Sequence, residues 1–170
     1  MSNETFRLVP AGPEDFDIYL SLKSEPLNIY WSGFEKAPDK EGLMQHFCKA
    51  LRSECREVYL LKAGNEGVGY LYLDYSAELQ QVELAYGISE KWAGRGLAKI
   101  MIMQAIQKIR PGYNLLIAWI AESNIASIKT AVALGFSAGE KRERRELAQF
   151  SAPVTFIDFF RQISQNNEKA

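Results

Sequence analysis

The chain has 170 residues, 47% of them hydrophobic and 24% charged, a composition typical of a soluble globular domain with one sizeable core. Its formal net charge of -1 argues against a nucleic-acid partner, because a broad nucleic-acid-binding face needs a clustered excess of lysine and arginine. No basic and apolar leader opens the sequence, and no apolar run reaches membrane-spanning length. We therefore expect one domain over residues 1–170, cytoplasmic and without membrane contact.

Histidine and cysteine are too scarce to suggest a metal site. His46 is the only histidine, and its place in an ordinary helical pattern predicts a surface or boundary side chain. Cys48 and Cys55 are seven positions apart in an expected helix, which separates them by about two turns, too far for a disulfide. We expect both cysteines to be reduced packing residues, with metal binding by them as the alternative, and we expect no metal cofactor.

The first part of the chain is expected to form a strand, a helix, a loop and a second helix. Residues 6–9 alternate as a short strand, and a proline followed by two acids then predicts the first turn of a helix that ends near Ser24. Two prolines and a glycine within residues 25–40 predict a loop. A helix over residues 40–53 follows.

The next segments predict a β-hairpin and then a strand, a helix and a second strand. Residues 57–63 and 68–75 are rich in β-formers and flank a Gly-Asn-Glu-Gly turn, so they should pair antiparallel. A strand over residues 81–88, a helix beginning near Gly96 and an apolar strand over residues 115–121 form a βαβ unit. Its two strands should be parallel, with a right-handed crossover.

The last part of the chain predicts a helix and one further strand. Apolar residues from Ile125 onward have helical spacing, and Gly135 is typical of a position just beyond a helix end. Residues 154–160 predict the last strand, and the mixed-charge run 141–146 a solvated strand or loop before it. Residues 164–170 are expected to be a frayed tail.

The segment Trp92-Ala93-Gly94-Arg95-Gly96-Leu97-Ala98 joins the strand over residues 81–88 to the following helix. Two glycines at a helix start leave backbone N–H groups exposed, and no Cβ atom keeps a ligand away. The first-turn amides and the positive end of the helix macrodipole both favour a phosphate. Lys91, Arg95 and Lys99 add positive charge. The segment therefore predicts a diphosphate-binding turn.

Two common nucleotide motifs do not match this turn. The dinucleotide-binding fingerprint would place a glycine where Lys99 stands, and it would place its first glycine at the tip of the strand, whereas five residues separate the strand end from Gly94. A Walker A loop would need a lysine followed by serine or threonine after Gly96. A nicotinamide cofactor and a P-loop site are therefore disfavoured.

Written as Lys91-x-x-Gly94-x-Gly96-x-Ala98, the turn resembles the coenzyme A pyrophosphate motif of the GNAT superfamily of acyl-CoA-dependent N-acyltransferases. The strand over residues 82–88, Asn124-x-x-Ser127 and Leu134-Gly135-Phe136 resemble the branch that contains the N-terminal acetyltransferases of ribosomal proteins. The resemblance covers residues 6–160. It implies an α/β (α+β) fold with a mixed, mostly antiparallel sheet of about seven strands flanked by about four helices, and a parallel pair splayed around the CoA site.

This resemblance implies acetyl-CoA as the co-substrate, with its pantetheine arm entering between the splayed strands. A backbone N–H near residues 86–88 would then face the thioester oxygen. The residues that the resemblance assigns to the cofactor are Tyr86, Ile88, Ala93, Gly94, Arg95, Gly96, Leu97, Ala98, Asn124 and Lys129. For Lys129, an ordinary solvated helix lysine is the alternative.

Two residues are candidates for the chemistry. An amine attacks a thioester only as the free base, and Glu83 is the candidate base, directly or through water, the alternative being an ordinary strand carboxylate. Many members of this family place a tyrosine seven residues after the asparagine to protonate the thiolate, but Ala131 stands there. Ser127 is the candidate substitute. The alternative is that Asn124 caps the helix and Ser127 is only a first-turn residue.

Tyr30, Trp31 and Phe34 fall in the early loop that flanks the acceptor pocket in this family, although such aromatics more often pin a loop to the core. We expect an N-acetyltransferase that transfers an acetyl group to a primary amine, either a protein N-terminal α-amine or a small-molecule amine. It would act as a monomer or homodimer. The alternative is a non-catalytic acyl-CoA-binding or sensing domain.

Overall fold

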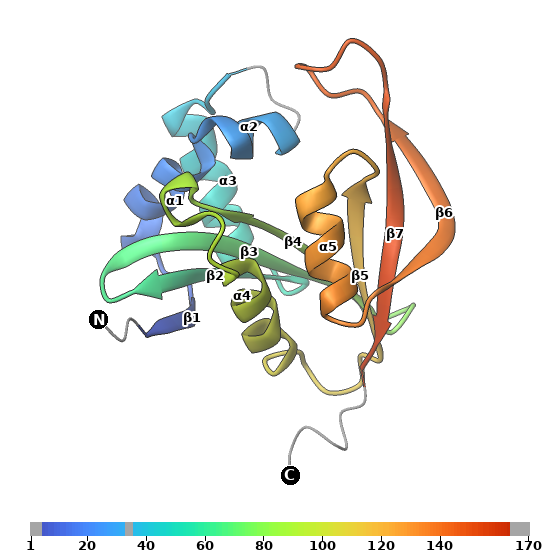
Figure 1. Cartoon of the computed structure of the whole chain (residues 1–170). Coiled ribbons are helices and arrows are strands. Elements are labelled where there is room, and N and C mark those ends of the chain that lie inside the picture. The colour runs from blue at the N-terminus through green and yellow to red at the C-terminus, as the bar shows by residue number, and fades with distance from the viewer. Residues whose placement is uncertain (1–4, 33–35, 164–170) are drawn as a thin grey trace.

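The computed structural model describes residues 5–32 and 36–163, and within them seven strands form one sheet in the order β1-β2-β3-β4-β5-β7-β6 (Figure 1). Neighbouring strands are antiparallel except β4 and β5, which are parallel. The strands are β1 (Phe6–Pro10), β2 (Arg56–Ala63), β3 (Glu66–Ser76), β4 (Gln81–Ile88), β5 (Leu115–Ala121), β6 (Ser137–Arg145) and β7 (Val154–Gln162). The mixed, mostly antiparallel sheet implied by the family resemblance is confirmed.

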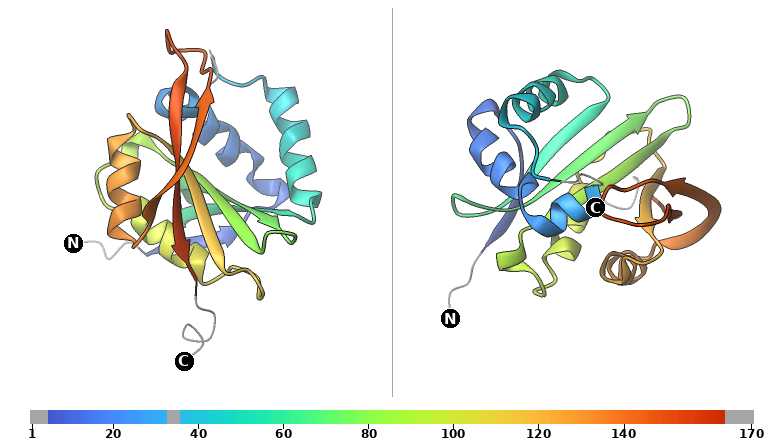
Figure 2. Two further views of the ribbon diagram at one scale, coloured as in Figure 1. Left: turned by 90° about the vertical axis from the view of Figure 1, so that its right-hand side faces the viewer. Right: turned by 90° about the horizontal axis from the view of Figure 1, so that it is seen from above.

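Helices cover both faces of this sheet. In the described ranges they are α1 (Phe16–Lys23), α2 (Pro26–Ser32), α3 (Lys40–Arg52), α4 (Leu97–Ile106) and α5 (Ile125–Ala133), with short 3-10 helices η1 (Pro13–Asp15) and η2 (Glu90–Trp92). Helices α1 and α3 pack on one face and α4 and α5 on the other (Figure 2). None of the helices described is long and apolar enough to span a bilayer.

The alternation of side chains along β3 divides the core between these two faces. Tyr70 and Tyr72 pack with α1 and α3, whereas Leu71 and Leu73, one position along, pack with α4. This follows from the two-residue period of a strand, which sends successive side chains to opposite faces. Aromatic and polar side chains therefore line one face of the sheet centre, and a mainly aliphatic core lies on the other.

Strands β4 and β5 are paired only at their beginnings. The register joins Gln81 to Leu115, and the last paired residues are Glu83 and Ile117. Each strand then continues with its other neighbour alone, β4 with β3 as far as Ile88 and β5 with β7 as far as Ala121. A gap therefore opens in the middle of the sheet at the carboxyl ends of β4 and β5, where the expected splayed pair lies.

The expectation of a loop over residues 25–40 is wrong for its first part, because residues 26–32 form α2. Pro26 is compatible with a helix since it occupies the first helical position, where a missing N–H costs no hydrogen bond. The Ile29 amide donates to the Glu25 carbonyl at 3.0 Å, and the Ile29 side chain is buried. Tertiary burial of one face thus stabilises a short helix that proline content alone argued against.

The expectations about the two cysteines also need correction. Helix α3 ends at Arg52, so Cys55 lies beyond it and is exposed, which excludes a packing role. Cys48 is half-buried, and both cysteines are free. Among the described side chains, no group of three or more potential ligands lies close enough to hold a metal ion.

Candidate functional site

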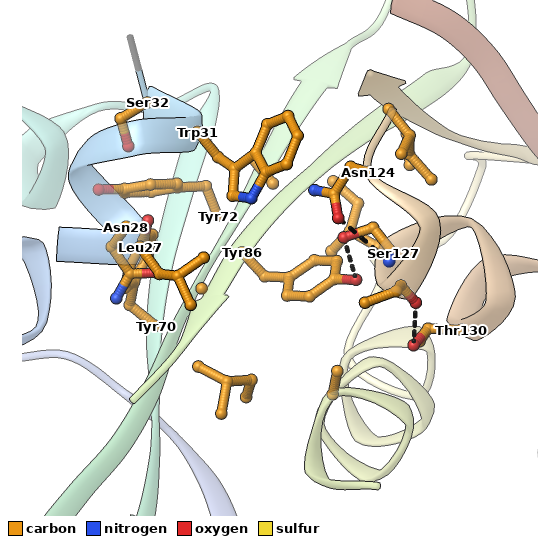
Figure 3. A pocket seen from close by; sticks show the side chains of 18 of the residues that line it. Leu27, Asn28, Trp31, Ser32, Tyr70, Tyr72, Tyr86, Asn124, Ser127 and Thr130 are labelled. Carbon is orange, nitrogen blue, oxygen red and sulfur yellow. Dashed lines mark hydrogen bonds between the residues drawn. The ribbon is translucent and has the colours of Figure 1, made fainter. Parts of the chain in front are cut away.

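A cavity of about 720 Å³ lies beside β4 at the place where β4 separates from β5 (Figure 3). One end is lined by the turn that contains Gly94 and Gly96 and by the first turn of α5. The other end is lined by side chains of α1, α2 and β3, among them Lys23 and Trp31. The cavity therefore connects the two faces of the sheet through the gap between the parallel strands.

The double-glycine turn has the geometry of an anion-binding helix start. Gly94 and Gly96 have φ values of +76° and +73°, in the left-handed region that residues with a Cβ rarely adopt, and a Cβ on either would project into open space. Gly96 caps α4 without a side chain that could accept from the free N–H groups of the first turn. Leu97 and Ala98 line the cavity. The turn thus fits a bound diphosphate.

The cations near this turn differ in their contacts and in their exposure. Lys91 Nζ lies 2.6 Å from Glu66 Oε1 in the β2–β3 hairpin, and this pairing lowers the pKa of Glu66. The Arg95 guanidinium stacks 4.8 Å from the ring centroid of Trp92. Lys99 and Lys129 are exposed. Arg95 and Lys129 do not line the cavity, whereas Ala93 does.

Tyr86 and Ser127 meet across the gap in the sheet. The Tyr86 hydroxyl donates to Ser127 Oγ at 3.3 Å (Figure 3). Burial raises the pKa of Tyr86, so its hydroxyl is neutral at physiological pH. Asn124 caps α5, because its Oδ1 accepts from the Ser127 amide at 3.4 Å. These three residues and Ile88 line the cavity. Asn124 can therefore cap the helix and contact a ligand at the same time.

Glu83 lies beside the cavity rather than in its wall. It is exposed at the last β4–β5 pair, and its Oε1 accepts from Trp119 Nε1 at 3.0 Å. Trp119 lines the cavity. Strand alternation puts Glu83 and Gly87 on the same face of β4, opposite Tyr86. Glu83 is therefore on the face of α1 and α2, one side chain away from the cavity.

The early aromatics have separate positions. Trp31 lines the cavity from α2, whereas Tyr30 packs on Phe150 with ring centroids 4.5 Å apart and does not line it. Phe34 lies outside the described residues. Tyr30 thus pins α2 to the segment between β6 and β7, and Trp31 faces the open space.

Several residues that line the far end of the cavity were missed by the sequence analysis. They share no local motif, because α1, α2, α3, β2 and β3 each contribute one or two: Lys23, Asn28, His46, Arg56, Tyr70 and Tyr72. The alternation of Tyr70 and Tyr72 in a strand could have indicated that both face the same side. Nothing local could have indicated that Lys23 joins them.

Comparison with known proteins identifies the family. The family model described as acetyltransferase (GNAT) domain matches residues 5–137. A search of curated protein sequences gives no significant match. Among solved structures, a spermidine N-acetyltransferase from Vibrio cholerae in complex with CoA and spermine has a TM-score of 0.81 and 17% identity, covering 94% of this chain and 96% of that one.

Two further structures have similar folds. A ribosomal-protein-alanine N-acetyltransferase from Brucella melitensis has a TM-score of 0.77 and 18% identity, covering 92% of this chain and 99% of that one. An acetyltransferase from Salmonella typhimurium that modifies the N-terminal serine of a ribosomal protein has a TM-score of 0.80 and 15% identity, covering 96% and 97%. The sheet with its splayed parallel pair, the double-glycine turn and the family model agree, and the chain belongs to the acetyltransferase (GNAT) family.

Proposed function

We propose that this protein transfers the acetyl group of acetyl-CoA to a primary amine, either a small molecule or a protein N-terminus. One observation carries the proposal: a single cavity joins the double-glycine turn on one face of the sheet to an aromatic pocket on the other, through the gap between β4 and β5. A donor and an acceptor can therefore meet at the gap from opposite faces. The Vibrio structure holds CoA and spermine, which supports such a two-ligand arrangement.

The residues present fit coenzyme A. The N–H groups that follow Gly94 and Gly96 would bind the diphosphate, and the unpaired edge of β4 near Tyr86 and Ile88 would bind the pantetheine amides. Asn124 and Ser127 would lie near the sulfur. When bound, acetyl-CoA supplies an acyl group activated by a good thiolate leaving group.

The chemistry requires one bond to form and one to break. The amine nitrogen forms a bond to the acetyl carbonyl carbon, and the bond from that carbon to sulfur breaks with its electron pair leaving on sulfur. Glu83 accepts the amine proton through water. Ser127 Oγ donates a hydrogen bond to the departing thiolate, which takes one proton from solvent. The missing tyrosine at Ala131 is thereby replaced by a hydroxyl that Tyr86 holds in position.

The test is release of CoA thiol from acetyl-CoA over a panel of amines and short peptides. We expect amine-dependent release with at least one acceptor and a product heavier by one acetyl group in mass spectrometry. The absence of a tyrosine at position 131 supports one other candidate, a CoA-binding domain without turnover. Tight CoA binding by calorimetry with no thiol release on any amine would favour that candidate.

A further inference from the structure

The end of the cavity proposed to hold the acceptor, lined by α1, α2 and β3, contains a cation for which the described residues supply no counter-ion. Lys23, the last residue of α1, lines the cavity and is half-buried. Its Nζ lies 4.8 Å from the ring centroid of Tyr70 and 5.8 Å from that of Tyr72. Among the residues that the structure describes, no carboxylate pairs with Lys23. A buried charge is costly unless it is paired, so this position favours a ligand that brings the missing anion.

The other charged groups at this end do not neutralise Lys23. The Arg56 guanidinium is already held by Asp74, through Nε at 2.5 Å and a second nitrogen at 3.0 Å. Burial, with a smaller contribution from Arg56, lowers the pKa of Lys23 to about 8. Burial and the nearby cations also lower the pKa of His46. Among the described groups at this end of the cavity, Lys23 thus remains a charge without a counter-ion.

The hydroxyls nearby add polarity without negative charge. Tyr19 and Tyr72 hydrogen-bond to each other through their hydroxyls. Burial raises the pKa of both phenols, so neither supplies an anion at physiological pH. The pocket around Lys23 is therefore aromatic, partly desolvated and positive.

A hydrogen-bond acceptor lies close to the β4 backbone. Asn28 Nδ2 donates to the Leu22 carbonyl at 2.8 Å, and this bond turns Oδ1 towards Gly87. A Cβ on Gly87 would lie 2.6 Å from Asn28 Oδ1 and 2.5 Å from Tyr70 Cε1. Only glycine permits this approach, which leaves an amide oxygen and the Tyr70 edge against the strand where the gap opens.

We propose that the acceptor is a small primary amine with a carboxylate or a similar anionic group within a few bonds of its nitrogen. Asn28 Oδ1 accepts a hydrogen bond from the amine, and Lys23 binds the anion. Tyr70 sets their separation, since one edge of its ring touches Gly87 and its face lies under Lys23. This specificity rests on the proposed acetyl transfer, and it differs from the polyamine bound in the Vibrio structure.

Turnover with matched acceptors tests the charge preference. Glycine, L-leucine and L-phenylalanine are each compared with the corresponding amide. Spermidine and a pentapeptide with an acidic N-terminal residue are tested as alternative acceptors. The α-amine of an amide has the lower pKa and is more available as free base, so a preference for the acid must come from the protein. We expect kcat/KM to be at least tenfold higher for an acid than for its amide. Faster turnover of amides, spermidine or the pentapeptide would overturn the proposal.

Variants at Lys23 assign the preference to this side chain. Lys23→Met should abolish the acid preference with KM for acetyl-CoA unchanged, and Lys23→Arg should retain most of it. Lys49→Met is the matched control, because Lys49 is exposed on α3, near the same cluster but outside the cavity lining. A Lys23→Met protein that keeps the preference would overturn the proposal.

Product binding separates failure of this proposal from failure of acetyl transfer. Calorimetry with N-acetyl-L-phenylalanine and its amide, in the presence of CoA, needs no turnover. We expect the acid to bind at least tenfold more tightly than the amide, and Lys23→Met to remove the difference. Equal binding of acid and amide overturns the anion site, whatever the activity. An absence of thiol release with retained, Lys23-dependent acid binding overturns only the proposed function.

Discussion

The hydroxyl of Tyr86 lies 3.3 Å from Ser127 Oγ and joins β4 to α5 across the gap in the sheet. The Ser127 amide is also fixed, because it donates to Asn124 Oδ1 at the helix cap. Ser127 is thus held by its own helix and by the strand opposite. A serine hydroxyl with a fixed direction can stabilise a developing thiolate at little cost in reorganisation.

Ser127→Ala should therefore lower kcat by roughly 10- to 100-fold while KM for acetyl-CoA changes little, since the lost interaction forms mainly in the transition state. Tyr86→Phe should have a smaller effect of the same kind, because Ser127 remains but is less well oriented. Steady-state kinetics with the best acceptor measures both variants. Ser123→Ala, at an exposed position outside the cavity lining, serves as the control. An unchanged kcat in Ser127→Ala would remove Ser127 from the mechanism.

Gly96→Ala should weaken CoA binding by at least tenfold, because the added methyl group projects into the space where a diphosphate would lie. Gly64→Ala is the matched control. Gly64 has a φ of +61° and open space around its Cβ position, so both substitutions impose similar backbone strain, about 1 kcal/mol. Calorimetry with CoA and thermal melts measure the two effects. If both variants lost a similar amount of melting temperature and bound CoA with equal affinity, the assignment of this turn to the diphosphate would be contradicted.

Much of the fold could be predicted from the sequence because its signals are local. Strand alternation, the Gly-Asn-Glu-Gly turn and the strand, helix and strand over residues 81–121 each occupy a continuous segment, and the structure has the corresponding β3, β4, α4 and β5. The prolines and glycine of residues 25–40 predict a loop and not helix α2, because they are read as helix breakers, whereas Pro26 occupies the first helical position, where proline is tolerated.

The two ends of the cavity also differ in how local their sequence signals are. The proposed cofactor end is built from one segment around Gly94 and from the start of α5. The two glycines predicted an anion-binding turn, and the resemblance to the GNAT family added Asn124 and Ser127. The acceptor end is assembled from elements far apart in sequence. Lys23 has the pattern of an ordinary cation at a helix C-terminus, where the macrodipole favours positive charge. Only tertiary packing brings its ammonium group over the ring of Tyr70 and into the cavity.

Glu83→Gln should reduce turnover most for the most basic acceptors. Alkylamines with a pKa of about 10.4 are almost fully protonated at pH 7, whereas α-amines with a pKa of about 8 are partly free base. Removal of a proton acceptor therefore matters more for the alkylamines. Comparing kcat/KM for one acceptor of each kind measures this difference. Glu78→Gln, an exposed carboxylate in the turn before β4, is the control. Equal losses for both amines would show that Glu83 does not assist deprotonation.

Lys23→Met should stabilise the ligand-free protein at pH 7. Burial lowers the pKa of Lys23 from 10.5 to about 8, so between these values the unfolded chain holds a proton that the folded protein has lost. The free energy of unfolding of the wild type therefore rises with pH across this window. The free energy of unfolding of the Lys23→Met protein does not have this contribution, because Met does not titrate. The stabilisation by Lys23→Met, up to about 3 kcal/mol from the size of the pKa change, should be fully present below pH 8 and shrink towards pH 10.5.

Urea denaturation of both proteins at pH 7 and pH 10 measures this difference. The groups around Lys23 are His46 on α3, Arg56 on β2, and Tyr70 and Tyr72 on β3, and since both proteins contain them, their own titration largely cancels. Lys49→Met, at an exposed position, should change stability by less than about 0.5 kcal/mol at either pH. A Lys23→Met protein that is no more stable than wild type at pH 7, or equally stabilised at both pH values, would show that the Lys23 charge carries no cost. The position of Lys23 would then not favour an anionic ligand on energetic grounds.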